Sequence, residues 1–367
     1  MSKKIRVLYT IPNFDTAGSG KSVYDLVKNM DRTQFDPEIC VTRNDGNFFK
    51  EVEKLDVKIH TFSFKTKTRP WITYPLRLFR IVKFFKRYKF DIIHSWNWSS
   101  DISEPLAARL AGIPYVYTKK AMGWGNKNWI RKSNLSTKII AVNQDIIDLY
   151  LQGMSSKVVR FPLAIDTDVY KSKAISSDIS KSTYFDSDDF VIVSVANLVA
   201  VKGIEVLFEA VTSLKDDKIK VLIVGNDKND YALQLKEKYK THENFVFVGK
   251  HMEVRPFIEL ADLFVIPTKD EGRREGIPNA PLEAMSMECV VLGSNVSGVK
   301  DVLREFPDCI FEASNIEMLA EKIKWVKQMS THDKNELGSR MRDQVITEFS
   351  INEFLRNHET LYLSIVN

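Results

Sequence analysis

Short apolar runs rich in β-branched residues recur along the first part of the chain, and helical patterns lie between them. The runs cover residues 5–11, 36–43, 90–96, 114–118, 138–143 and 157–162. Apolar residues at helical spacing cover 20–30, 76–89 and 102–111. Continuous apolar runs are typical of parallel strands that are buried on both faces, and their alternation with helices predicts a doubly wound α/β domain.

A polar segment rich in Ser, Asp and Lys, residues 166–189, interrupts this alternation. Apolar runs then restart at 190–198, 218–226, 244–250, 261–268 and 289–295, with helical patterns at 203–214, 230–240, 254–260 and 280–288. We therefore expect a Rossmann-like domain over 1–165, a linker over 166–189 and a second Rossmann-like domain over 190–350. A final helix, 351–367, is expected to return to the first domain.

The amino-acid composition is consistent with two packed cores, and the net charge and the cysteines limit which ligands we expect. The chain has 367 residues, of which 44% are apolar and 28% charged, with a net charge of +5. This mild excess suits anionic ligands or an anionic membrane surface and does not require nucleic acid. The sparse cysteines argue against a disulfide framework and a zinc site, and are expected to be buried reduced thiols: Cys40, Cys289 and Cys309.

The N-terminal apolar run is expected to be a strand and not a signal peptide, because it lacks a longer apolar core and a cleavage site. No run reaches the roughly 18 apolar residues of a membrane-spanning helix. We therefore expect a cytoplasmic protein that does not cross a membrane.

The segment 266–294, IPTKDEGRREGIPNAPLEAMSMECVVLGS, contains the strongest chemical pattern. A strand is expected to end near Pro267, and a helix capped by Asn279 is expected to follow a charged loop. The N–H groups at such a helix start suit a phosphate or a sugar oxygen. Glu275 and Glu283 offer carboxylates to vicinal hydroxyls, so a sugar or ribose is a sensible ligand; a solvated acidic loop is the alternative.

The string EGIPNAPLEAM, with Glu275 and Glu283 at its acidic positions, resembles the E-x7-E motif of retaining GT-B glycosyltransferases of family 4. The resemblance covers nearly the whole chain. It implies two doubly wound Rossmann-like domains that face a central cleft, and transfer of a hexosyl-type unit from a nucleotide sugar to a hydroxyl acceptor. It also implies that Glu275 lies against the donor sugar and that Glu283 binds the ribose hydroxyls. The backbone of Gly276 and Ile277 is expected to hold the diphosphate or the sugar.

A second segment, 193–211, resembles the first strand and loop of the family's donor domain. Lys202 matches the lysine that contacts the donor phosphate, and a lysine supplies positive charge to a leaving diphosphate without a metal ion. Asn197 replaces the family's arginine, so it offers hydrogen bonds but no charge. Arg273 or Arg274 could compensate for that loss.

Further matches extend the expected nucleotide site. Gly225 corresponds to a glycine of the turn near the base or the diphosphate, and the backbone at 250–252, with Met252, to the loop that cradles the nucleobase. In the first domain, Gly18 and Gly20 correspond to a flexible loop near the donor diphosphate and the acceptor.

Two basic residues of the first domain, Lys120 and His94, also align with positions of the resembled family. Lys120 stands where many family members carry a histidine, and it is expected to contact the donor sugar or the acceptor. His94 matches a family histidine that is mostly structural.

Several alternatives remain beside this interpretation. Residues 20–22 read GKS, as in a phosphate-binding loop of an NTPase, but Asp15 stands where that loop needs glycine. A sugar-nucleotide-binding protein without turnover is a further alternative. The Asp-x-Asp pattern within 186–189 is expected to be a solvated turn, so we predict no metal and no cofactor besides the nucleotide-sugar substrate.

The segment 69–90 mixes aromatic residues with arginine and lysine. Such a helix either lies on an anionic bilayer or packs on the sheet with a solvated basic face, and both interpretations stay open. The expected partners are a nucleotide sugar and a glycan or lipid-linked acceptor, with no nucleic acid. The family resemblance implies a role in bacterial surface polysaccharide or lipid-linked glycan synthesis.

Overall fold

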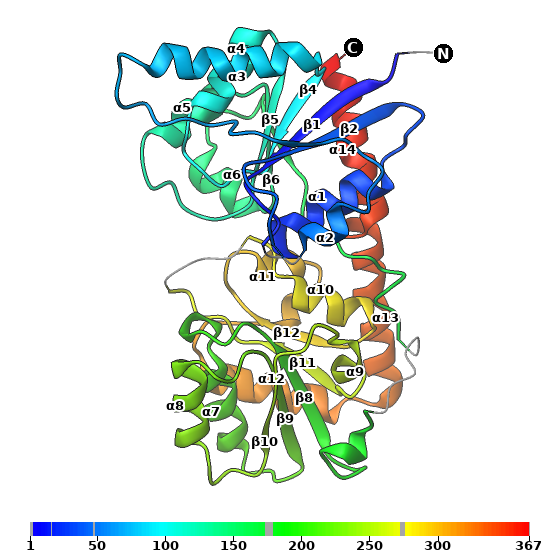
Figure 1. Cartoon of the computed structure of the whole chain (residues 1–367). Coiled ribbons are helices and arrows are strands. Elements are labelled where there is room, and N and C mark those ends of the chain that lie inside the picture. The colour runs from blue at the N-terminus through cyan, green and yellow to red at the C-terminus, as the bar shows by residue number, and fades with distance from the viewer. Residues whose placement is uncertain (1–2, 16, 47, 173–178, 272–275, 367) are drawn as a thin grey trace. The chain divides into compact units, whose positions relative to one another are not determined.

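The computed structural model separates the chain into two compact units (Figure 1). Unit 1 comprises Met1–Leu163 and Ile351–Asn367, and unit 2 comprises Ala164–Ser350. The structure describes residues 3–15, 17–46, 48–172, 179–271 and 276–366. Each unit is built on one parallel sheet flanked by helices, which confirms the predicted α/β fold with two Rossmann-like sheets.

Unit 1 has a seven-stranded parallel sheet in the order β3-β2-β1-β4-β5-β6-β7. Its strands are β1 (Ile5–Ile11), β2 (Phe35–Val41), β3 (Ile59–Thr61), β4 (Ile92–Ser95), β5 (Tyr115–Lys119), β6 (Lys138–Ala141) and β7 (Val158–Arg160). Its helices are α1 (Ala17–Asn29), α2 (Phe49–Val52), α3 (Tyr74–Tyr88), α4 (Ser103–Ala111), α5 (Asn128–Leu135), α6 (Gln144–Tyr150) and α14 (Ile351–Val366). Because the strand order reverses between β1 and β4, right-handed connections place helices on both faces of the sheet.

The C-terminal helix α14 packs into unit 1 beside α1 (Figure 1). Its Tyr362 is fully buried, and the hydroxyl lies 2.6 Å from Nδ1 of His94 and 3.1 Å from the hydroxyl of Tyr9. The other ring nitrogen of His94 lies 2.8 Å from the hydroxyl of Thr118. His94 therefore joins β4, β5 and α14 in the core, which is a structural role.

Unit 2 has a six-stranded parallel sheet in the order β10-β9-β8-β11-β12-β13. Its strands are β8 (Phe190–Val195), β9 (Ile219–Val224), β10 (Phe245–Gly249), β11 (Leu263–Ile266), β12 (Val291–Ser294) and β13 (Ile310–Phe311). Its helices are α7 (Ile204–Leu214), α8 (Asp230–Lys238), α9 (Arg255–Ile258), α10 (Asn279–Ser286), α11 (Val299–Val302), α12 (Ile316–Gln328) and α13 (Thr331–Glu348). The described residues of this unit also form three short 3₁₀ helices: η1 (Lys181–Thr183), η2 (Ala200–Lys202) and η3 (Pro307–Cys309).

The described part of the segment expected to be a linker, 166–172 and 179–189, belongs to unit 2. The carbonyl oxygen of Tyr170 accepts hydrogen bonds from Oγ of Ser286 at 2.7 Å and from Nη1 of Arg342 at 3.0 Å. These bonds hold the backbone near Tyr170 against α10 and α13. This part of the polar segment is therefore packed as part of unit 2 through its backbone.

Both sheets have a point where the strand order reverses, between β1 and β4 in unit 1 and between β8 and β11 in unit 2. Ligands of open α/β sheets bind beyond the carboxyl ends of the strands at such a point. In unit 2, the segments that follow β8 and β11 are 196–203 and 267–271. These segments contain predicted site residues and are the starting point for the site.

Candidate active site

The turn that carries Lys202 lies against the end of β11. Gly203 has a positive φ of 64°, and a Cβ atom there would lie 2.2 Å from the carbonyl oxygen of Pro267. The N–H of Lys269 donates to the carbonyl of Val201 at 2.8 Å, which fastens the turn to the same segment. Only glycine fits position 203. The close backbone contact therefore fixes the position of the Lys202 Cα atom, and the Lys202 side chain is half-buried.

The loops after β8, β9 and β10 meet at the same edge of the unit 2 sheet. A Cβ atom on Gly225 would lie 2.1 Å from the carbonyl oxygen of Ala196, and the N–H of Gly225 donates to the carbonyl of Gly249 at 2.9 Å. Asn197 follows Ala196 directly and is exposed. Met252, in the loop after β10, is 87% exposed. The structure therefore brings the loops of Asn197 and Gly225 together and places Met252 in the neighbouring loop.

Helix α10 begins at Asn279, and Pro278 occupies the position before it without any side-chain cap. The expectation that Asn279 caps this helix is wrong, because Asn279 is itself the first helical residue. Gly298, with a φ of 82°, lies against the start of this segment: a Cβ atom there would lie 2.0 Å from the carbonyl oxygen of Gly276. Ile277 is buried. The helix end is thus held closely by backbone packing, and the residue at its N-cap position, Pro278, supplies no side-chain cap.

Glu283 is half-buried on α10, and its carboxylate lies near the hydroxyl of Tyr170. Burial raises the pKa of Tyr170, and the adjacent Glu283 raises it further, so this hydroxyl stays a donor at neutral pH. The pattern of the sequence gave no sign of this contact, because Tyr170 lies in the polar segment far from α10 along the chain. Tyr170 is therefore a site residue that sequence analysis missed.

Glu275 falls within 272–275, together with Arg273 and Arg274, outside the described residues. Its expected contact with the donor sugar remains a prediction from the family motif. The nearest described residues on the two sides are Glu271 and Gly276.

A second group missed by sequence analysis lies at the end of β11. The ammonium of Lys269 pairs with Glu205 at 2.8 Å and with Glu271 at 2.6 Å, and both carboxylates raise the pKa of Lys269. The hydroxyl of Thr268 is buried and has no hydrogen-bond partner among the described residues. An unpaired buried hydroxyl at a point of strand reversal is a candidate ligand contact.

The predicted residues Gly18, Gly20 and Lys120 belong to unit 1. Gly18 and Gly20 lie in the first turns of α1, so the helix predicted over 20–30 begins earlier and includes the segment that the family comparison placed in a loop. A Cβ atom on Gly20 would lie 3.0 Å from the ring of Phe14, so this glycine allows close packing of the helix. The neighbouring Lys21 pairs with Asp25 of the same helix at 2.9 Å. Lys120 is half-buried after β5, and its ammonium donates to the carbonyl of Trp96 at 2.7 Å.

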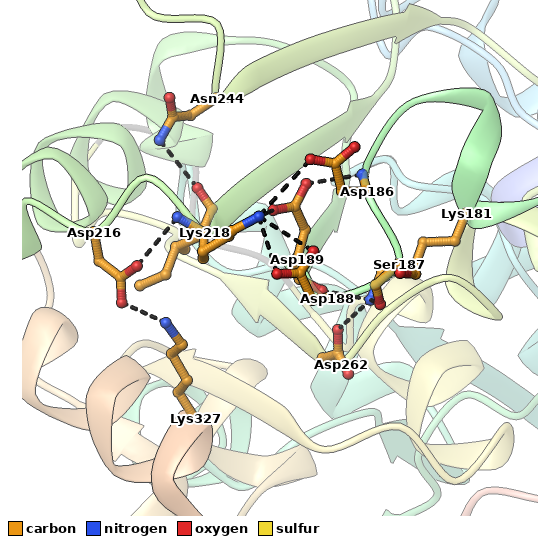
Figure 2. Close-up of polar contacts among 11 residues, drawn as sticks. Lys181, Asp186, Ser187, Asp188, Asp189, Asp216, Lys218, Asn244, Asp262 and Lys327 are labelled. Atoms are coloured by element: carbon orange, nitrogen blue, oxygen red, sulfur yellow. Dashed lines mark hydrogen bonds and ion pairs between the residues drawn. The ribbon is translucent and has the colours of Figure 1, made fainter.

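The Asp-x-Asp segment lies at the amino end of the unit 2 sheet, before β8. Figure 2 shows Lys218 among its three carboxylates, at 3.8 Å from Asp186, 3.0 Å from Asp188 and 3.7 Å from Asp189. The hydrogen bond from Lys218 lowers the pKa of Asp188. The ammonium of Lys218 therefore offsets part of this negative charge, and the three acids lie at the opposite end of the strands from the residues predicted to bind a nucleotide.

Two family models match most of the chain. The model described as Glycosyltransferase Family 4 matches residues 16–169, and the model described as Glycosyl transferases group 1 matches residues 176–344. A capsular polysaccharide biosynthesis glycosyltransferase of Staphylococcus aureus, CapH, is 24% identical over 96% of this chain and 100% of its own length. The UDP-Gal:α-D-GlcNAc-diphosphoundecaprenol α-1,3-galactosyltransferase of Escherichia coli is 24% identical over 79% of each chain.

Solved structures share the whole fold. A glycosyltransferase from Rickettsia africae superposes with a TM-score of 0.87 at 19% identity, covering 100% of both chains. The Anabaena protein HepE in complex with UDP superposes with a TM-score of 0.82 at 17% identity, covering 99% of this chain and 100% of its own. Fold and site thus define a GT-B type α/β protein. The chain is a glycosyltransferase, composed of a family 4 N-terminal domain and a group 1 C-terminal domain.

Proposed function

We propose that this glycosyltransferase transfers a sugar from a nucleotide-sugar donor to a hydroxyl acceptor, with retention at the anomeric carbon. The observation that carries the proposal is the carboxyl edge of the unit 2 sheet. There, glycines without room for a Cβ atom fix the Lys202 turn, the Gly225 turn and the uncapped start of α10. The complexes of HepE with UDP and with UDP-glucose support a nucleotide sugar as the donor.

Each group at this edge has a chemical role in the proposal. Lys202 and the first N–H groups of α10 stabilise the leaving diphosphate, with no metal ion. Glu283 binds the ribose hydroxyls, and Glu275 orients the donor sugar. Asn197, Gly225 and Met252 lie around the base and the diphosphate. This set describes leaving-group stabilisation and donor positioning; it leaves the choice between a covalent and a front-face mechanism open.

We further propose that the acceptor is a glycan or a lipid-linked glycan of a bacterial surface polysaccharide pathway. The support comes from the relatives. CapH is named for capsular polysaccharide biosynthesis, and the E. coli relative is named for a diphosphoundecaprenol acceptor.

A surface of unit 1 supports contact with a membrane. Trp71, Ile72, Leu76 and Phe79, which we call the α3 patch, are 68, 91, 74 and 64% exposed. Basic residues continue along α3, and a neighbouring groove is lined by Lys58, Arg80, Lys83 and Arg87. The opposite side of α3 is buried in the unit through Leu78, Ile81, Val82 and Phe85. Among the described residues, no helix has the length and apolarity to span a bilayer. We propose that the α3 patch rests on an anionic bilayer from the cytoplasmic side.

The donor proposal is tested by thermal shift with UDP, GDP, ADP and their sugar conjugates, because a ligand that binds the native state stabilises it. One nucleotide class is expected to raise the melting temperature. Lys202→Gln should weaken that shift, whereas Lys228→Gln, an exposed lysine after β9, should not. No shift with any nucleotide would overturn the proposal.

Turnover separates the enzyme from a protein that only binds sugar nucleotides. Glu275→Ala is expected to keep the nucleotide-induced shift and to lose release of nucleotide from the matching sugar nucleotide. Chelation of divalent ions with EDTA should leave turnover unchanged. If turnover requires an added divalent ion, the metal-independent part of the proposal is wrong. NMR of the product's anomeric proton then tests retention directly.

A further inference from the structure

A group of lysines and indoles in unit 1 lies where β4 and β5 end and includes one residue of the proposed site, Lys120. We call it the lysine–indole cluster, and its members are Trp96, Asn97, Trp98, Lys119, Lys120, Trp124, Trp129 and Lys132. The carboxyl ends of parallel strands are where the fold places ligands. The cluster lies entirely within unit 1, so its geometry does not depend on the placement of unit 2.

The three lysines of the cluster donate only to backbone carbonyls among the described residues. Lys119 donates to Ala121 at 3.1 Å and to Gly123 at 3.0 Å, and Lys120 donates to Trp96 at 2.7 Å. Lys132 donates to Asn97 at 3.3 Å and to Ser99 at 3.1 Å. Lys119 and Lys132 are fully buried. Buried cations are normally paired with an anion, so this cluster has an excess of positive charge.

The buried carboxylate of Glu104, close to the cluster, already accepts hydrogen bonds from other side chains. Glu104 on α4 accepts hydrogen bonds from Ser95 at 2.9 Å, from Tyr115 at 3.0 Å and from Thr10. Burial raises the pKa of Glu104, and Lys132 acts on it only as a more distant charge. Glu104 therefore does not supply a directly bound counter-ion to the lysines.

Several polar side chains of the cluster are buried without a partner. Asn97 is 5% exposed, and neither its Oδ1 nor its Nδ2 has a hydrogen-bond partner among the described residues. The indole nitrogens of Trp96 and Trp124 also lack partners there. Native proteins satisfy most buried polar groups, so three unsatisfied donors beside three ammonium groups indicate a ligand that accepts hydrogen bonds.

Aromatic rings surround the charged groups. The ammonium of Lys119 lies 5.1 Å from the ring centre of Trp98, 5.2 Å from that of Trp129 and 4.8 Å from that of Tyr150. Trp98 is 43% exposed, and it stacks obliquely on Trp129 with the ring centres 4.7 Å apart. An exposed indole supported from behind offers a flat apolar face, as the C–H face of a sugar ring requires.

We propose that the lysine–indole cluster binds an oxyanion attached to a sugar ring of the substrate glycan, either a carboxylate or a phosphate ester. The half-buried Lys120 and the amide of Asn97 hold the oxyanion, and Trp98 supports the ring. The buried ammonium groups of Lys119 and Lys132 add positive charge to the site. This inference deepens the proposed function, because it assigns an acidic sugar to the substrate; the binding step itself needs neither donor nor turnover.

Binding of four probes to the full chain, followed by ligand-observed NMR, tests the inference. D-Glucuronate carries the carboxylate, D-glucose 6-phosphate carries the phosphate ester, D-glucose is neutral, and inorganic phosphate lacks the ring. At least one anionic sugar should bind at least tenfold more tightly than both glucose and inorganic phosphate, and the better of the two identifies the anion. Equal binding of glucose, equal binding of inorganic phosphate, or no binding of either anionic sugar would overturn the proposal.

Variants localise the binding. Lys120→Gln and Asn97→Ala are each expected to weaken the anionic sugar at least tenfold, and Lys120→Arg should restore most of the affinity. Lys28→Gln removes an exposed lysine over the ring of Tyr24 in the same unit and should change nothing. Unchanged affinity in both Lys120→Gln and Asn97→Ala, with the fold intact by circular dichroism, would place the ligand elsewhere and sink the inference.

The pH dependence gives a signature that a purely structural role does not share. Burial, reinforced by the charge of Lys132, lowers the pKa of Lys119 and of Lys120 to about 7. A bound oxyanion favours the ammonium forms, so affinity should fall at least threefold between pH 6.5 and pH 8.5 and binding should take up protons. The charged and titratable groups around these lysines are Lys132, Glu104, Asp101, Lys65 and Tyr150. An affinity independent of pH would contradict this geometry.

The UDP-induced thermal shift distinguishes failure of this inference from failure of the proposed function. If UDP stabilises the chain and the anionic sugars do not bind, only the inference fails. If the sugars bind and no nucleotide stabilises the chain, the donor proposal fails while the anionic site stands.

Discussion

At the scale of single residues, backbone geometry that only glycine can adopt positions the proposed donor site. Gly203 and Gly298 both have a positive φ. A Cβ atom added at either position would clash with a backbone carbonyl oxygen, at 2.2 Å for Gly203 and 2.0 Å for Gly298. Such contacts forbid a side chain, whereas the sequence shows only that glycines occur near the expected loops. The family motif predicted Gly276 and Ile277 but could not reveal that Gly298 presses against Gly276, because residues this close in space are separated along the chain.

Gly203→Ala is expected to destabilise unit 2 and to weaken nucleotide binding. A residue with a Cβ atom costs roughly 1–2 kcal/mol at a left-handed φ, and the clash with Pro267 adds roughly 1–3 kcal/mol. Gly153→Ala is the matched control: its φ is 77°, and nothing lies within 4 Å of the added Cβ atom. Hydrogen exchange in peptides from β8 and β11 measures the loss. Equal effects of the two substitutions on their own units would contradict the clash.

Tyr170→Phe is expected to weaken binding of the nucleotide with little loss of fold stability. The hydroxyl of Tyr170 lies near Glu283, and we infer that it donates to this carboxylate and orients it for the ribose. One hydrogen bond is worth about 0.5–1.5 kcal/mol, which is about 2- to 13-fold in Kd. The specific readout is the ratio of Kd for UDP and 2′-deoxy-UDP, which should approach unity in the variant. A variant that keeps the ratio of the unaltered protein would show that Tyr170 only supports the packing.

At the scale of elements, the apolar runs located the strands well, since a strand buried on both faces must be continuously apolar. β1 spans Ile5–Ile11, as predicted, and the other predicted strands differ mainly at their ends. The exceptions are the edge strands β3, in which only Ile59 is apolar, and β13, which has two residues; neither forms an apolar run that would predict a strand. The family resemblance placed Gly18 and Gly20 in a loop, whereas both lie in the first turns of α1, where Gly20 packs closely on Phe14.

The docking of α14 on unit 1 makes the stability of that unit depend on pH. Burial lowers the pKa of His358 to about 4 and the pKa of His94 well below its usual value. Because the unfolded chain binds protons near pH 6.5 and the folded chain does not, stability is full above that pH and falls as the pH drops toward 4. Each histidine contributes up to about 1.4 kcal/mol per pH unit in this window.

His358→Phe should therefore flatten the loss of stability between pH 6.5 and pH 4.5 by roughly 2–3 kcal/mol. Phenylalanine keeps the packing of the ring against Phe354 and Phe161 and removes the titration. Tryptophan fluorescence during urea unfolding follows unit 1, which contains every tryptophan except Trp325. His332→Gln changes an exposed histidine and serves as the control. An unaltered pH profile in His358→Phe would mean that His358 is protonated in the folded state.

At the scale of the whole molecule, the two units carry different parts of the proposed chemistry. The sequence predicted a nucleotide site in unit 2 from two short segments, 193–211 and 266–294, because a phosphate site depends on few consecutive residues. The lysine–indole cluster arises from residues between Trp96 and Lys132 that converge only in the fold. Of the three lysines in this cluster, sequence analysis predicted only Lys120 as a site residue, because it stands where many family members carry a histidine. A site formed by residues from several strand ends could therefore be recognised only in the structure.

From the exposed apolar side chains of the α3 patch we predict that the protein binds to anionic membranes. The chain should sediment with vesicles that contain anionic lipid, and raising the salt concentration should weaken this binding without abolishing it, because apolar insertion persists when charge is screened. Leu76→Ser combined with Phe79→Ser removes two exposed apolar side chains and should release the protein at either salt concentration. Leu233→Ser changes a leucine on α8 of unit 2 that is 52% exposed, and it should leave binding unchanged. Sedimentation that is equal for all three proteins, or absent at low salt, would exclude the α3 patch as the membrane surface.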